Sequence, residues 1–168
     1  DRVGAVAASA GINGGDGTDT IENKGAISAG AQAFALHQNA SLSFGGAPRV
    51  DMSAKATAAA AGVDMGAGDE SLHNDGSISA ATQAHAVAVT ASVTAKQLPL
   101  VDKIGQIFFA DYNDLTVRSN AFSYGVESKE GDLSLVNDGD ISASATSSAS
   151  SASAQVTFSV EFDSTVKK

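Results

Sequence analysis

Small or aliphatic residues alternate with polar ones along most of this chain, with a period of two. The pattern is longest in the segments 29–36, 80–93 and 143–162. A period of two places successive side chains on opposite faces of an extended strand. These segments are therefore predicted to be β-strands.

An alanine-rich helix is the competing interpretation, because alanine is the best helix former. The many Ser, Thr, Val and Gly residues and the scarcity of Glu, Lys and Leu favour strands instead. In the residues that lead into and form the first of these segments, Asn23, Ile27 and Ala29 share one parity, whereas Gln32 and Phe34 take the other. One face of the strand is thus predicted to be small and apolar, and the other to carry larger or polar groups.

Three copies of one pattern, aliphatic-x-Asn-x-Gly-x-Ile-Ser-Ala, align without gaps from Ile21, Leu72 and Leu135, at spacings of 51 and 63 residues. An alternating, alanine-rich segment and a glycine-rich acidic turn precede each copy, and a long alternating segment follows it. Repeats of this length are typical of solenoids. We expect a single all-β solenoid domain over residues 1–168, with repeats near 2–48, 49–113 and 114–162.

The asparagine of each copy has two interpretations. Asn-x-Gly is a turn signal, because both residues tolerate positive φ. If the copies stack in register, Asn23, Asn74 and Asn137 are expected to form a ladder of side-chain amides, as identical strands do when they stack. An independent turn in each copy is the alternative.

The stretch from Gly11 to Ile27, GINGGDGTDTIENKGAI, resembles repeats of large bacterial secreted and autotransporter-type adhesins. The resemblance covers residues 2–40, 49–96 and 114–162. It implies a parallel β-helix or related solenoid, secreted and displayed on a bacterial cell surface for adhesion or as a stalk. It transfers no catalytic residue.

The first acidic turn matches the calcium-binding nonapeptide G-G-x-G-x-D-x-U-x, in which glycine turns present oxygen ligands to the ion. The match occurs once, whereas successive turns normally share each ion. Asp16 and Asp19, with Asp69 and Glu70 of the second copy, are the candidate Ca²⁺ ligands. An acidic turn without metal is the alternative.

Composition narrows the function. The apolar content is 43 %, but alanine supplies most of it and aromatics make up only 5 %. Burial of such small side chains contributes little stabilising free energy per residue, so regular backbone pairing is expected to stabilise the fold. A net charge of −9 argues against nucleic acid and anionic membranes as partners. No run reaches the roughly 18 apolar residues of a membrane span. The absence of an initiator Met at Asp1 fits a processed product.

Catalytic chemistry is not indicated. His37, His73 and His85 lack metal-ligand spacing and are expected at solvent-facing strand positions. No hydrolase, zinc-protease or nucleotide-binding motif occurs. Most carboxylates lie in glycine-rich turns, where solvation explains them. The chain is therefore predicted not to be an enzyme.

Residues 97–113 break the repeat and, with the residues just after them, concentrate the aromatics. Insertions in solenoids form loops on one face that often bind partners, so Ile107, Phe108, Phe109 and Tyr112 are predicted to contact a partner. The alternative is that the insert packs on the solenoid or caps it.

These observations predict an extracellular, non-catalytic structural or adhesive protein, whose partner is itself or a cell-surface glycan or protein. One alternative is a filament subunit joined end to end or by strand exchange, because neither end of the repeat array looks like a polar cap. A second is a polysaccharide-degrading β-helix enzyme, which requires convergent carboxylates in a cleft.

Overall fold

The computed structural model describes residues 1–44, 49–97 and 112–160. This part of the chain contains nine strands and no helix. The strands are β1 (Arg2–Asn13), β2 (Thr20–Asn23), β3 (Ala26–Phe44), β4 (Arg49–Asp64), β5 (Glu70–Asn74), β6 (Ser77–Gln97), β7 (Tyr112–Glu127), β8 (Leu133–Asn137) and β9 (Asp140–Val160). The all-β prediction is confirmed.

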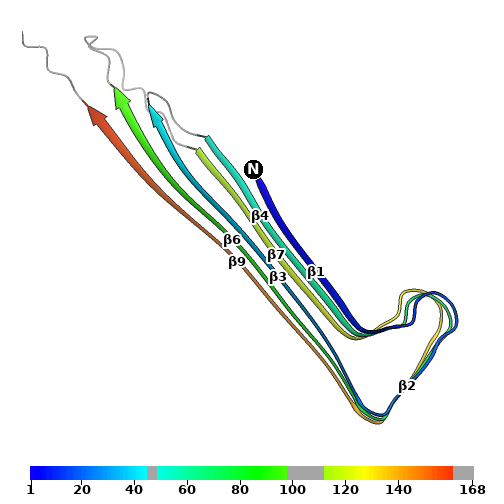
Figure 1. The fold of residues 1–168 in the computed structure, drawn as a ribbon. Coiled ribbons are helices and arrows are strands. Elements are labelled where there is room, and N and C mark those ends of the chain that lie inside the picture. The colour runs from blue at the N-terminus through cyan, green and yellow to red at the C-terminus, as the bar shows by residue number, and fades with distance from the viewer. Residues whose placement is uncertain (45–48, 98–111, 161–168) are drawn as a thin grey trace, which may run out of the picture.

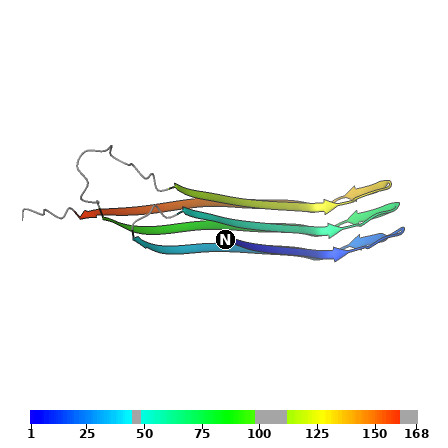
Figure 2. The ribbon, with the colours of Figure 1, turned by 90° about the horizontal axis from the view of Figure 1, so that it is seen from above.

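Each repeat copy contributes one strand to each of three parallel sheets, β1-β4-β7, β2-β5-β8 and β3-β6-β9 (Figure 1). The pairing keeps one register throughout: Ala29 lies beside Ala80, and Ala80 beside Ala143. We call the copies layer 1 (Arg2–Phe44), layer 2 (Arg49–Gln97) and layer 3 (Tyr112–Val160), and Figure 2 shows them stacked in this order.

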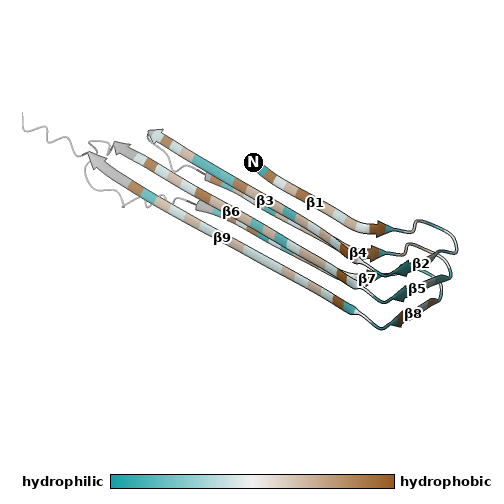
Figure 3. Ribbon diagram, turned by 60° about the horizontal axis from the view of Figure 1, so that its bottom comes forward, coloured by the Kyte–Doolittle hydropathy of each residue, from teal (hydrophilic) through white to brown (hydrophobic). Residues whose placement is uncertain are grey.

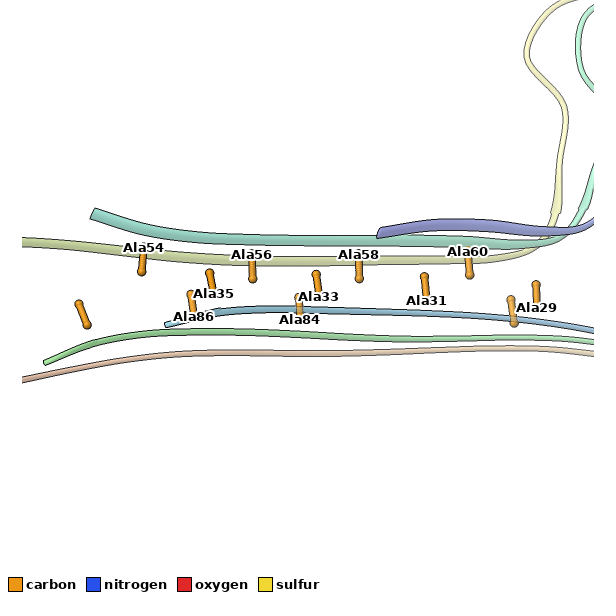
Figure 4. Close-up of a cluster of buried hydrophobic side chains, with 12 residues drawn as sticks. Ala29, Ala31, Ala33, Ala35, Ala54, Ala56, Ala58, Ala60, Ala84 and Ala86 are labelled. Carbon is orange, nitrogen blue, oxygen red and sulfur yellow. The ribbon is translucent and has the colours of Figure 1, made fainter. Parts of the chain in front are cut away.

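Alanine side chains form the core between the two long sheets. Within a layer the chain runs out along one long strand, bends through the short strand, and returns along the other (Figure 1). Every second residue of the long strands points between the sheets, and Figure 4 shows these methyl groups alternating from opposite sides. Because a methyl group is short, the two sheets pack closely. The buried set is Ala29, Ala31, Ala33, Ala35, Ala54, Ala56, Ala58, Ala60, Ala80, Ala84, Ala86 and Ala88.

Larger aliphatic side chains fill the bend, where the third sheet holds the long strands apart. Val63, Met65, Leu72 and Ile78 form a second buried cluster there. Figure 3 shows strongly apolar residues of the long strands gathered near this end. Residue size therefore follows the width of the section, with alanine along the arms and branched residues at the bend.

The facing sheets are staggered along the stacking direction. β3 contacts both β1 and β4, and β6 contacts both β4 and β7. Among the described strands, β9 has substantial contact across the core with β7 alone. As a result β9 is exposed at every residue from Asp140 to Val156, although the equivalent face of β6 is buried.

A column of glycines marks the point where each layer bends. Gly11, Gly62 and Gly125 occupy the position facing an isoleucine of the returning strand. A Cβ on Gly62 would fall on the Cγ2 atom of Ile78 and 2.6 Å from the carbonyl oxygen of Gly125. The isoleucine thus occupies the space that a side chain would need, which only glycine leaves open.

His37 corrects one expectation. It was predicted at a solvent-facing position, but it is buried and its Nδ1 lies 3.3 Å from the carbonyl oxygen of Ser53. The reason is parity, because His37 continues the inward-facing row of Ala31, Ala33 and Ala35. His73 is exposed and His85 is half-buried on the outer face of β6.

Gly62→Ala is expected to lower the free energy of unfolding by about 1–3 kcal/mol, the scale of an overpacked core. Gly30→Ala is the matched control, because its Cβ meets nothing closer than the Ala81 carbonyl oxygen at 3.9 Å. The control should change stability by no more than about 0.5 kcal/mol. Urea unfolding followed by circular dichroism measures both, and equal midpoints would contradict the steric argument.

Candidate functional site

The three asparagines form a continuous ladder across the layers. Asn23 Nδ2 donates to Asn74 Oδ1 at 2.6 Å, and Asn74 Nδ2 donates to Asn137 Oδ1 at 2.6 Å. Each asparagine also bonds its own turn; for example, Gly25 N–H donates to Asn23 Oδ1 at 3.1 Å, and Asn137 Nδ2 donates to the Gly139 carbonyl at 2.9 Å. The two interpretations of the Asn-x-Gly motif therefore hold together, because one side chain closes its turn and bridges to the next layer.

Asn74→Ala is expected to lower the free energy of unfolding by about 2–3 kcal/mol, since it leaves amide groups of Asn23 and Asn137 without their ladder partner. Asn74 is completely buried. Gln83→Ala is the control, because Gln83 accepts a bond of 3.4 Å from Gln32 on the exposed outer face. We expect a change within about 0.5 kcal/mol there. A comparable loss in the two variants, measured by urea unfolding, would show that burial of the ladder is unimportant.

The acidic turns stack, but they distribute the predicted calcium ligands over different positions. Asp16 is exposed and forms a bridge with Ala67, which forms another with Glu130. Asp69 is exposed, and its Oδ1 accepts a bond from the Asp132 N–H at 3.2 Å. Of the four predicted residues, the structure thus joins Asp19 to Glu70 by a hydrogen bond, whereas Asp16 and Asp69 contact other residues of the turns.

One hydrogen bond joins Asp19 and Glu70, and each of the two side chains has one buried oxygen without a partner. The Asp19 N–H donates to Glu70 Oε2 at 3.1 Å. Glu70 is only 3 % exposed, yet its Oε1 and the Oδ2 of Asp19 are buried without a hydrogen-bond partner. A buried carboxylate oxygen without a partner is costly. A bound cation satisfies carboxylate oxygens of this kind, and Ca²⁺ favours them as ligands.

Glu70→Gln keeps an oxygen for the Asp19 amide and replaces the buried carboxylate with an amide. We expect the free energy of unfolding in metal-free buffer to rise by about 1 kcal/mol. If the pair binds calcium, millimolar calcium should raise the melting temperature of the wild type and leave that of the variant unchanged. Thermal unfolding in EDTA and in calcium measures both effects. A wild-type melting temperature that is identical in the two buffers would remove calcium from this site.

A second group of potential ligands lies on the exposed face of the short sheet. One ligand atom each from Glu22, His73 and Asp75 lies within 4.8 Å of the others. These groups already have partners: Lys24 Nζ lies 2.6 Å from Glu22 and lowers the pKa of that carboxyl, while His73 Nε2 lies 3.1 Å from Asp75 and 3.6 Å from Asp138. We interpret the group as a surface ion-pair network.

A shallow groove of about 500 Å³ lies on the outer face of the β1-β4-β7 sheet, beside the bend. The register places Phe122 next to Ala59 and Tyr124 next to Ala61. Ala8 and Ala10 continue the two rows on β1. Two partly exposed aromatic side chains therefore stand beside a floor of methyl groups.

Polar groups line the groove at the end near the bend. Asn13, Asp64 and Glu127 occupy equivalent positions of the three layers. Asp64 is held in place, because Gly66 N–H donates to its Oδ1 at 3.1 Å and Lys129 Nζ lies 3.1 Å from its Oδ2. This contact raises the pKa of Lys129. The groove thus combines an aromatic wall, an amide and two carboxylates.

Most of the predicted partner-binding residues lie outside the part of the chain that the structure describes. Ile107, Phe108 and Phe109 fall outside the described residues. Tyr112 begins β7, but its side chain is not described either. Sequence reasoning did not identify the groove, although one signal was present: Phe122 and Tyr124 share a parity and align with alanines in the other copies.

Comparison of the chain with protein-family models, with curated proteins and with solved structures finds no match to any of them. In the described ranges no helix has the length and hydrophobicity that a membrane crossing requires.

Proposed function

We propose that this chain is a non-catalytic β-solenoid module of a secreted bacterial surface protein, serving as an adhesive segment or stalk. The observation that carries the proposal is the single register in which all three repeat copies pair along their whole described length. Such stacking adds length with each copy, so its product is an elongated scaffold. The resemblance of the Gly11–Ile27 pattern to adhesin repeats supports a surface location.

The groove beside Phe122 and Tyr124 is the adhesive site in this proposal. Sugar rings combine a face of C–H groups, which packs on aromatic side chains, with hydroxyl groups that donate to carboxylates and amides. The volume of the groove, about 500 Å³, is within the range of small-ligand sites. Glu127 and the net charge of −9 disfavour acidic glycans. A neutral cell-surface glycan is therefore the ligand that fits best.

Phe122→Ala with Tyr124→Ala is expected to weaken glycan binding by about tenfold or more, equivalent to about 1.4 kcal/mol. Phe34→Ala is the matched control, since Phe34 is an exposed aromatic on the outer face of the other long sheet. Binding to an array of neutral oligosaccharides identifies the ligand, and calorimetry with it gives the affinities. Failure of the wild type to bind any neutral glycan, or an equal loss in the control, would remove the groove from the proposal.

An enzymatic role makes a different prediction for the same groove. Asp64 and Glu127 are neighbours on adjacent strands, and glycan hydrolysis uses a pair of carboxyl groups. The hydrogen bond from Gly66 and the ion pair with Lys129 favour a structural role for the Asp64 carboxylate. Release of reducing ends from the bound oligosaccharide would indicate that the groove is catalytic and not adhesive. We expect the oligosaccharide to remain intact.

A further inference from the structure

Layer 3 leaves exposed the apolar residues that layer 2 buries. Leu72 and Ile78 are each 1 % exposed, whereas their equivalents Leu135 and Ile141 are 43 % and 37 % exposed. The inward-facing row of β9 is exposed as well, because the stagger of the sheets gives β9 little opposite it except β7. A further strand in the position that β4 holds relative to β3 would cover this row.

The two ends of the stack are complementary in polarity. The asparagine ladder runs one way, with each Nδ2 donating toward the layer that follows. Among the described residues the ladder begins on Asn23 in layer 1 and its last member is Asn137 in layer 3. An Asn23 placed above Asn137 would present Oδ1 toward Nδ2, as Asn74 does toward Asn23. The strands within each sheet are parallel, so the backbone groups at the layer 1 edge are oriented to pair with those at the layer 3 edge.

Side-chain charge is complementary at the same turn. Lys24, Asp75 and Asp138 occupy equivalent positions of the three layers. Glu22 is the main cause of the raised pKa of Lys24, and Asp75 of the next layer adds to it. A layer 1 continued beyond layer 3 would put a lysine next to Asp138. The exposed Leu135 and Ile141 would contact Ile21 and Ile27 of the next copy, so each of these two rows would remain aliphatic across the junction.

We propose that copies of this chain stack head to tail, with layer 1 of one copy continuing the three sheets beyond layer 3 of another. The inference rests on the solenoid in the proposed function and specifies its partner surface. The contact is heterologous, so it repeats without closing and produces a filament. It reproduces the interface between layers, in which backbone pairing, the asparagine ladder and aliphatic rows are already combined.

Two neighbouring residues of β9 provide the test. Ala149 pairs with the buried Ala86 and belongs to the inward-facing row, whereas Ser150 pairs with Val87 on the outer face. Both are exposed in the single copy, so we expect lysine to be tolerated at either position. Stacking would bury a lysine only at position 149, where an inward-pointing charge blocks edge pairing.

Sedimentation velocity from micromolar to millimolar protein is expected to show growing assemblies for the wild type and for Ser150→Lys. Ala149→Lys is expected to sediment as a monomer, with association weakened by about a hundredfold or more. Its melting temperature should match that of the dilute wild type, which verifies that it is folded. Added to the wild type in small amounts, it should shorten filaments, because it joins through layer 1 and exposes a blocked layer 3.

Other outcomes overturn the proposal. A wild type that stays monomeric, or an Ala149→Lys chain that assembles as the wild type does, excludes stacking through this face. Growth that stops at the dimer indicates a two-fold contact instead of a head-to-tail one. Glycan binding by a strictly monomeric wild type would leave the proposed function standing while removing this inference. Filaments without glycan binding would do the reverse.

Discussion

The small size of the alanine side chain is the constraint on which this structure depends. Methyl groups from two sheets interdigitate over the length of the arms, and a larger side chain at these positions would push the sheets apart. Little apolar area is buried per residue as a result, so backbone pairing and the repeated register carry an unusual share of the cohesion. Where the section widens at the bend, Met65 and Ile78 replace alanine.

Much of the strand content, and the faces of the strands, could be predicted from sequence. The alternation identified the long strands, and the spacings of the Asn-x-Gly motif are the offsets of the strand register. The same parity places His37 in the core, but the prediction for that residue followed the usual preference of histidine for the surface. Local pattern was the better guide, because the inward row continues without a break from Ala29 to His37.

The remaining features depend on relations between layers that no single repeat contains. The glycine column follows from the closeness of Ile78 to Gly62 across the bend, and the groove follows from rows that combine residues of three strands. The burial of Glu70 likewise depends on its neighbours in the stack. Stagger of the facing sheets leaves no trace in the sequence, because it concerns the rise of the chain from one layer to the next.

The unequal spacing of the copies has a consequence for how such a chain changes. All 12 extra residues of the longer offset fall between Ala95 and Tyr112, the stretch that joins two layers, while the bends of the three layers are equal in length. One end of the molecule therefore tolerates added sequence and the other does not, because backbone hydrogen bonds between layers recur along the bend. Evolution, or a protein engineer, has room for foreign segments at the joining end. The bend end admits only exchanges that preserve length.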